Sequence, residues 1–205
     1  HVIIQGEEEA DWMQSGISMH KIKKEFLIDL PELNNYPVTM NNVQYSVCLY
    51  EKIIQLIDKY HIDVVESVLW DFEGAVPASL LKGKVPVIVR LQSPMLKVAE
   101  TQQWELTEDL KLAADFEASL MRDADRVIAI SDHIVETIWE LYPDALKYQT
   151  VDKVYLGVGE NVCKSARKKG NKAIRLLFVG RLERRKGIHT IFEILPDLMS
   201  KHSYF

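Results

Sequence analysis

Short apolar runs alternate with longer amphipathic stretches along the chain. Between residues 41 and 60, apolar side chains recur three and four positions apart, which predicts a long helix with one apolar stripe. Similar patterns predict helices over 73–81, 104–122 and 187–201, and Ser131 is a good N-cap for another that ends near Leu141. Short apolar or alternating runs predict strands over Val2–Gln5, Ile17–Ile22, 62–66, 86–91, 126–130, 151–156 and 174–179.

The alternation of strands with helices predicts an α/β fold with a mostly parallel, Rossmann-like sheet. Ligands of such sheets bind at the carboxyl ends of the strands. We therefore expect functional side chains in the loops after Glu66, Leu91, Ile130 and Val179.

A linker is predicted over residues 157–173, which are rich in Gly, Lys, Arg, Ser and Asn. The charge changes sign near its start, because residues 1–152 have a net charge of −13 and residues 153–205 one of +8. An anionic ligand is therefore expected in the C-terminal part. Nucleic-acid binding by the basic run in the linker is not expected, since no aromatic residues are interleaved with the charges.

The composition is typical of a soluble globular protein, with 47% apolar and 27% charged residues. No apolar run approaches the roughly 20 residues of a membrane span. Cys48 and Cys163 lie far apart without metal-ligand spacing, which favours two reduced cysteines. We expect a cytoplasmic protein without an essential metal or cofactor, and leave peripheral membrane association open.

Two cations near the C-terminus are the first candidate for ligand binding. Arg181 and Lys186 lie five residues apart where the predicted strand over 174–179 gives way to a helix. A helix N-terminus favours anions, and Arg and Lys both bind phosphate. Gly180 and Gly187 allow close backbone approach. The alternative is an exposed basic turn that faces water.

Side chains at the other predicted strand ends are candidates for the opposite half of a site. Glu66 closes the predicted strand over 62–66 and could hydrogen-bond a sugar hydroxyl, or cap a neighbouring helix. Gln92 begins the loop after 86–91, and Ser131 follows 126–130. Three further carboxylates, Asp71, Glu73 and Glu117, identify no acid/base pair by their spacing. Gly157 and Gly159 match a dinucleotide fingerprint only weakly, because its third glycine is absent.

Three motifs together resemble one enzyme family. Residues 174–188, IRLLFVGRLERRKGI, resemble the start of the C-terminal domain of retaining glycosyltransferases of family 4 (glycosyl transferases group 1), which have the GT-B fold. Upstream, 124–131, ADRVIAIS, and 154–158, VYLGV, are similar to stretches of that family's N-terminal domain. The resemblance covers nearly the whole chain.

The resemblance implies a fragment of such an enzyme. Residues 1–156 would be an N-terminal, acceptor-side domain that lacks its first strand, and 174–205 the first βα unit of a truncated nucleotide-sugar domain. Gly180, Arg181 and Lys186 match donor-binding positions, and the two cations match those that neutralise the donor diphosphate. Many members carry His where this sequence has Gln92, which makes an acid/base role doubtful there.

The expected function is therefore transfer of a sugar from a nucleotide-diphosphate sugar to a carbohydrate or lipid-linked acceptor, with retention of configuration. The 205-residue chain alone is expected to be inactive, because half of the cleft is missing. The alternatives are a non-catalytic nucleotide- or sugar-binding Rossmann module and an NAD-dependent oxidoreductase. Residues 174–205 cannot bury their apolar face alone, so we expect them to dock on another surface, with self-association as one way.

Overall fold

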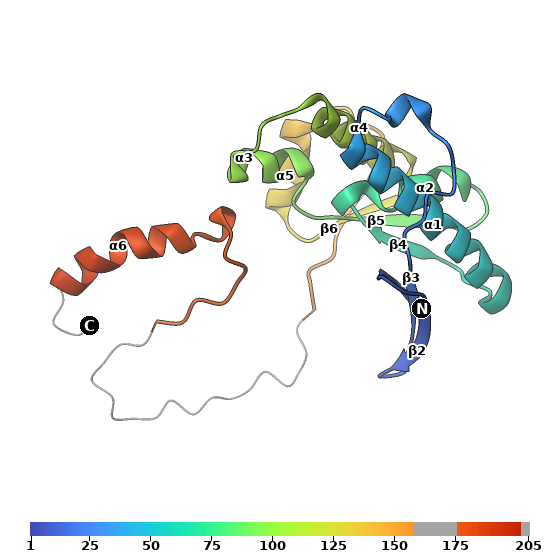
Figure 1. Ribbon diagram of the computed structural model, residues 1–205, viewed down its shortest axis with the longest axis horizontal. Helices are drawn as coiled ribbons and strands as arrows, with labels where there is room; N and C mark the ends of the chain where they lie inside the picture. The colour runs from blue at the N-terminus through green and yellow to red at the C-terminus, as the bar shows by residue number, and fades with distance from the viewer. Residues whose placement is uncertain (158–175, 202–205) are drawn as a thin grey trace. The chain divides into compact units, whose positions relative to one another are not determined.

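The computed structural model describes residues 1–157 and 176–201 (Figure 1). The chain divides into two compact units, which are treated separately below. The first comprises His1–Lys97 with Glu105–Tyr155, and the second comprises Val98–Trp104 with Leu156–Phe205.

A four-stranded sheet forms the centre of the first unit, in the order β4-β5-β6-β7. All its neighbouring strands pair in parallel. The strands are β4 (Val65–Val68), β5 (Val87–Leu91), β6 (Arg126–Ala129) and β7 (Val151–Lys153). The expected α/β class with a Rossmann-like parallel sheet is therefore confirmed.

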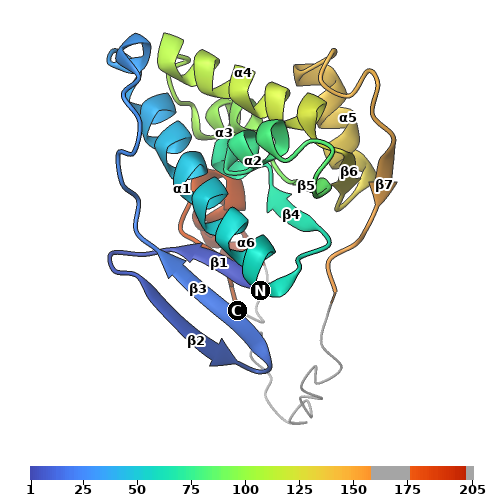
Figure 2. The same cartoon turned by 90° about the vertical axis from the view of Figure 1, so that its right-hand side faces the viewer.

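Three helices of the first unit pack against one another beside this sheet (Figure 2). They are α1 (Pro37–Tyr60), α2 (Ala75–Leu80) and α4 (Glu108–Asp123). Their apolar side chains form one core with Val87, Val89 and Leu91, all fully buried on β5. Burial of such side chains is the main force that holds the helices on the sheet. The helix α5 (Asp132–Leu141) also belongs to the first unit, and α3 (Met95–Gln102) begins in it.

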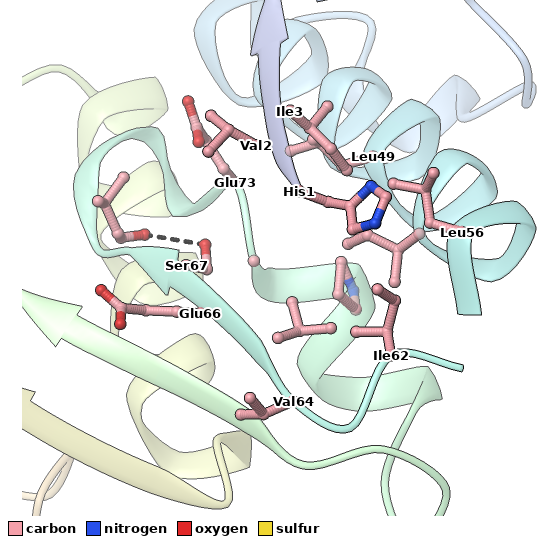
Figure 3. A pocket seen from close by; sticks show the side chains of 15 residues that line it. His1, Val2, Ile3, Leu49, Leu56, Ile62, Val64, Glu66, Ser67 and Glu73 are labelled. Atoms are coloured by element: carbon pink, nitrogen blue, oxygen red, sulfur yellow. Dashed lines mark hydrogen bonds between the residues drawn. The ribbon is translucent and has the colours of Figure 1, made fainter. Parts of the chain in front are cut away.

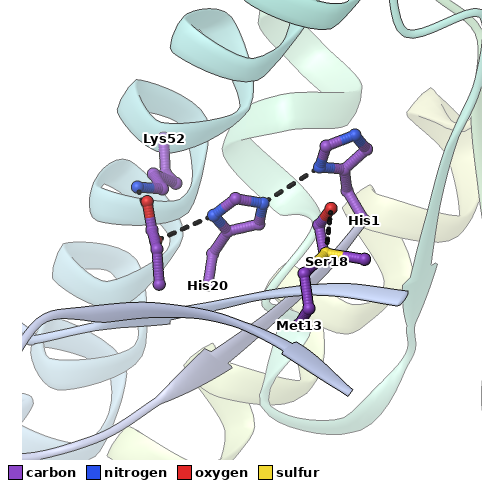
Figure 4. Close-up of polar contacts among 6 residues, drawn as sticks. His1, Met13, Ser18, His20 and Lys52 are labelled. Atoms are coloured by element: carbon purple, nitrogen blue, oxygen red, sulfur yellow. Dashed lines mark hydrogen bonds and ion pairs between the residues drawn. The ribbon is translucent and has the colours of Figure 1, made fainter. Parts of the chain in front are cut away.

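A second, smaller sheet lies at the N-terminus, in the order β1-β3-β2. It comprises β1 (Val2–Gln5), β2 (Ala10–Gln14) and β3 (Ile17–Ile22). A polar network joins it to α1 (Figure 4). Buried His20 contacts Asp11 Oδ1 through Nδ1 at 2.8 Å and His1 Nδ1 through Nε2 at 3.0 Å. Lys52 of α1 donates to Asp11 at 3.5 Å. The hydrogen bond from His20 is the main reason that the pKa of Asp11 lies below its usual value.

The described part of the C-terminal segment holds the short 3₁₀ helix η3 (Arg184–Lys186) and α6 (Ile188–Lys201). The helix expected over 187–201 is therefore confirmed. The strand expected over 174–179 is not formed across 176–179. A strand needs a neighbour to satisfy its backbone groups, and the side chains of Leu177 and Val179 are 86% and 83% exposed. Residues 174 and 175 lie outside the described residues.

Three other expectations need correction. The strand expected over 62–66 is β4, which begins three residues later and ends two residues later. The reason is that His61 ends α1 in the left-handed conformation and 62–64 form the connection. The helix expected over 104–122 corresponds to α4, which begins four residues later. The sequence pattern does not predict α3, which precedes it. The strand expected over 151–156 stops at Lys153.

Candidate functional site

The chain after β4 forms a tight, strained loop at the carboxyl edge of the parallel sheet. It contains the 3₁₀ helix η2 (Trp70–Phe72), in which Asp71 and Phe72 have φ angles of 54° and 44°. Positive φ at residues other than glycine costs free energy and persists only where the surroundings enforce it. Phe72 is fully buried, and its ring stacks on that of Phe116 with 5.1 Å between the ring centroids. This packing fixes the position of the loop on α4.

Gly74 fixes the other end of this loop. A Cβ atom at this position would lie 2.6 Å from Ser67 Oγ, so only glycine lets the loop pack this closely on β4. The hydroxyl of Ser46 in α1 donates to the carbonyl oxygen of Glu73 at 2.6 Å and accepts from the amide of Val76 at 3.0 Å. The backbone that carries Asp71 and Glu73 is therefore held at both ends.

The two carboxylates of this loop bind protons more tightly than usual. Burial raises the pKa of Glu73 to about 7, and the nearby Asp71 adds to the effect. Burial also raises the pKa of Asp71, while hydrogen bonds from Trp70 and Asn42 oppose the change. Perturbed carboxylates on a strained loop at a strand end are typical of functional sites. Residue spacing does not distinguish Asp71 and Glu73 from the other carboxylates of the chain, because burial and backbone strain cannot be deduced from spacing.

The register of the strands brings Gln92 and Ser131 to the same edge. Leu91 of β5 pairs with Ala129 of β6, so Gln92 is level with Ile130 and one residue short of Ser131. Gln92 is half-buried, and its side chain makes no hydrogen bond within the described ranges. Ser131 accepts from the amide of Ile134 at 3.3 Å, which confirms its predicted N-cap role. On the other side of β5, Val68 ends β4 and pairs with Arg90, and the amide of Leu69 donates to the carbonyl oxygen of Arg90 at 3.1 Å, so the loop that contains Asp71 begins at this edge.

Glu66 does not belong to this edge. It is the second residue of β4 and pairs with Ile88, four residues before Gln92, or about 13 Å along the strand. The expectation that Glu66 closes its strand is therefore wrong. Its carboxylate accepts from Arg90 Nε at 2.7 Å, and Arg90 also donates to the carbonyl oxygen of Val154 at 3.3 Å. Glu66 thus joins neighbouring strands in the structure.

The basic turn of the second unit is organised around Glu183. One carboxylate oxygen of Glu183 contacts Arg181 Nε at 2.7 Å, and the other contacts Arg185 Nε at 2.7 Å. The amide of Lys186 donates to the carbonyl oxygen of Glu183 at 3.0 Å. A Cβ placed on Gly180 would lie 3.9 Å from Lys186 Cγ, so the Lys186 side chain passes close to Gly180. Arg181, Lys186 and Gly180 therefore belong to one compact turn just before α6.

A cavity of about 510 Å³ lies between the two sheets of the first unit (Figure 3). Val2 and Ile3 of β1 line one side, Glu66 and Ser67 of β4 the other, and Leu49 and Leu56 of α1 lie alongside. Both β1 and β4 are the outermost strands of their sheets, so two unpaired strand edges border this cavity.

A family profile described as Glycosyltransferase Family 4 matches residues 20–158, more than half of the chain. The chain belongs to this family. No curated protein and no solved structure matches it significantly. The match covers the parallel sheet and its carboxyl edge, with Asp71, Glu73, Gln92 and Ser131. It ends before Arg181 and Lys186.

Family membership supports a transferase that binds a sugar donor and an acceptor. Within residues 1–157 and 176–201, no helix is long and apolar enough to cross a membrane. The same residues contain no group of three or more His, Cys, Asp or Glu side chains arranged to hold a metal ion.

Proposed function

We propose that the chain is part of a retaining glycosyltransferase that uses a nucleotide-diphosphate sugar. The observation that carries this proposal is the turn from Gly180 to Ile188, because it follows a Glycosyltransferase Family 4 domain and gathers Arg181, Lys186 and Gly180 before a helix. A phosphate group gains from fixed cations and from the dipole at a helix N-terminus.

In the proposed reaction, the bond between the sugar and the diphosphate breaks and an acceptor hydroxyl attacks the same face of the sugar. Negative charge grows on the leaving diphosphate, and Arg181 and Lys186 stabilise it. The leaving phosphate oxygen takes the proton of the acceptor hydroxyl. No group of this chain needs to change its protonation state, and Gln92 contributes only hydrogen bonds.

The acceptor is proposed to bind at the carboxyl edge of the parallel sheet. Asp71 and Glu73 supply acceptors for hydroxyl groups, Gln92 supplies both donors and an acceptor, and Ser131 borders the same edge. Glu66, which was the first acceptor candidate, is replaced in this role by Asp71 and Glu73 because of its position on β4.

We further propose that residues 1–156 are an acceptor-side domain without its first strand, and that 174–205 begin the donor domain. The cavity between β1 and β4 supports the first part, because a strand placed there would pair with both open edges. Exposed apolar side chains support the second part, since Leu177, Phe192 and Met199 are 86%, 68% and 56% exposed. Such a segment gains by packing on a further part of the protein or on a second copy.

Transfer assays on the natural protein that contains this chain test the proposal. Incubation with nucleotide-diphosphate sugars and candidate carbohydrate acceptors should release nucleoside diphosphate only when both substrates are present, and the product should keep the anomeric configuration of the donor. Donor binding without turnover would favour the alternative, a nucleotide- or sugar-binding module. Inverted products would contradict the retaining mechanism.

A further inference from the structure

Glu117 is a fully buried carboxylate at the centre of the first unit. It lies on α4, and its side chain has no exposed surface. A buried carboxylate is retained only where hydrogen bonds replace the lost water. Its partners lie at the start of α3 and directly after α5, so Glu117 connects parts of the chain that are distant in sequence.

The first partner is the backbone at the start of α3. The amide of Met95 donates to both carboxylate oxygens of Glu117, at 3.2 Å and 3.0 Å. Met95 is the first residue of α3, where amide groups have no partner within the helix. Glu117 therefore acts as a helix cap supplied by another helix.

The second partner is the residue that directly follows α5. Tyr142, itself buried, donates its hydroxyl to Glu117 Oε2 at 2.7 Å. In these contacts with Met95 and Tyr142, both carboxylate oxygens of Glu117 accept hydrogen bonds. An amide in its place offers only one acceptor oxygen, and its NH₂ group points at a donor.

Only three residues separate this anchor from the end of β5. Leu91 is fully buried at the strand end, and Met95 is held by Glu117. Pro94 lies between them and is buried as well. The loop over 92–94, which carries Gln92, is therefore fixed at both ends, at one by the sheet and at the other by Glu117.

We propose that Glu117 is a positioning residue that holds the loop over 92–94 and so sets the place of Gln92 at the acceptor edge. The assignment rests on the proposed function, in which this edge binds the acceptor. Glu117 does not itself touch the acceptor; it acts through Met95.

The titration of the Glu117 carboxyl group provides a measurable property by which this proposal can be tested. Burial raises its pKa to about 7, although the hydrogen bonds from Tyr142 and from the Met95 amide oppose the change. The groups that face Glu117 are the Tyr142 hydroxyl just after α5, the Met95 amide from α3, and Asp71 from η2, whose charge raises the pKa of Glu117 further. Asp115 of α4 acts on Tyr142.

Nuclear magnetic resonance on the 205-residue chain tests the anchor without any substrate. The Met95 amide resonance should shift with pH around a midpoint near 7 in the wild type. It should not do so in Glu117→Gln. Asp115→Asn serves as matched control, because it removes an exposed carboxylate from the same helix and should leave the shift unchanged. A Met95 resonance that still titrates in Glu117→Gln, or hydrogen exchange of the Met95 amide that is the same in the wild type and in Glu117→Gln, overturns the proposal.

Kinetics on the natural enzyme test the consequence for Gln92. Glu117→Gln should raise the KM for the acceptor several-fold and leave the KM for the donor unchanged, and Tyr142→Phe should have a smaller effect of the same kind. Equal changes in both KM values, with unchanged hydrogen exchange of the Met95 and Leu96 amides, overturn the positioning role. If the wild-type enzyme transfers no sugar, the proposed function is wrong. The Met95 resonance alone then tests whether Glu117 holds the loop.

Discussion

Arg181 Nε lies 2.7 Å from Glu183 Oε1, and this contact holds the guanidinium that precedes α6. The second oxygen of the same carboxylate lies 2.7 Å from Arg185 Nε. The side chain of Arg181 remains 72% exposed, so its other donors are accessible to a ligand. Glu183 therefore orients one cation of the proposed diphosphate site and shares its negative charge between two arginines.

The first prediction concerns this cation pair. In the natural enzyme, Arg181→Ala or Lys186→Ala should lower kcat by about 10² to 10³, as loss of other electrostatic stabilisers does. The reason is that the charge on the leaving diphosphate grows in the transition state. Initial rates at saturating donor, together with thermal unfolding to confirm an intact fold, measure the effect.

The matched control is Arg184→Ala, in the same basic turn. Arg184 is exposed and makes no ion pair within the described part of the chain. It should keep kcat within about threefold, since an exposed charge without a fixed partner contributes little. Equal losses for Arg181, Lys186 and Arg184 would show that only the net charge of the turn matters.

The second prediction concerns the pH dependence of acceptor binding. Glu73 has a pKa raised to about 7, so it becomes ionised as the pH rises through this value. Only the ionised carboxylate accepts hydrogen bonds with both oxygens. The KM for the acceptor should therefore fall as pH rises from 6 to 8, and Glu73→Gln should remove this dependence. An unchanged pH profile in Glu73→Gln would exclude Glu73 from the acceptor site.

The parallel sheet could be predicted from the sequence because its strands are short apolar runs with long amphipathic helices between them. β5 shows this directly, since Val87, Val89 and Leu91 alternate along an apolar strand and are fully buried. Ser131 was also predictable as an N-cap, because its role depends only on neighbouring backbone groups. Both the strand β5 and the Ser131 N-cap could be predicted because they depend on residues that are near one another in the sequence.

Features that depend on distant residues could not be predicted. The pKa values of Glu73 and Glu117 are set by burial beneath helices that are far away in the chain. The strained φ of Asp71 is enforced by the packing of Phe72 on Phe116. The strand expected before Gly180 fails for the same reason, because strand formation depends on a neighbour rather than on its own apolar residues.

The third prediction concerns stability. The pKa of Glu117 is raised from 4.5 to about 7 on folding, so the folded state binds more protons than the unfolded state between these values. The contribution of Glu117 to the free energy of unfolding is therefore largest below pH 4.5, falls as pH rises to 7, and then levels off. The total fall is about 3 kcal/mol at most.

Urea unfolding of the wild type and of Glu117→Gln between pH 4.5 and pH 8 measures this contribution. The difference in the free energy of unfolding between the two proteins should change with pH in that window, with the wild type losing more as pH rises. Asp115→Asn should follow the wild-type curve. A constant difference between wild type and Glu117→Gln would mean that Glu117 stays ionised.

The last prediction concerns the cavity between β1 and β4. In a parallel pair, alternate residues direct their backbone groups to one side. The amide of Val65 donates to Pro86 and that of Leu69 to Arg90, so the backbone groups of Glu66 and Val68 point away from β5, toward the open edge. On β1, the amide of Gly6 donates to Ile22, which directs the backbone groups of Ile3 to the open edge there. A strand between them would satisfy these groups.

We expect a further segment of the natural protein to supply this strand. Amide hydrogen exchange should then be slow at Ile3, Glu66 and Val68 in the natural protein and fast in the 205-residue chain, because an exposed amide without a partner exchanges freely. Val87 is the internal control, since its amide donates to Asp125 at 2.8 Å and should be protected in both. Fast exchange at all three positions in the natural protein would show that no strand fills the cavity, and that the two sheets stay separate.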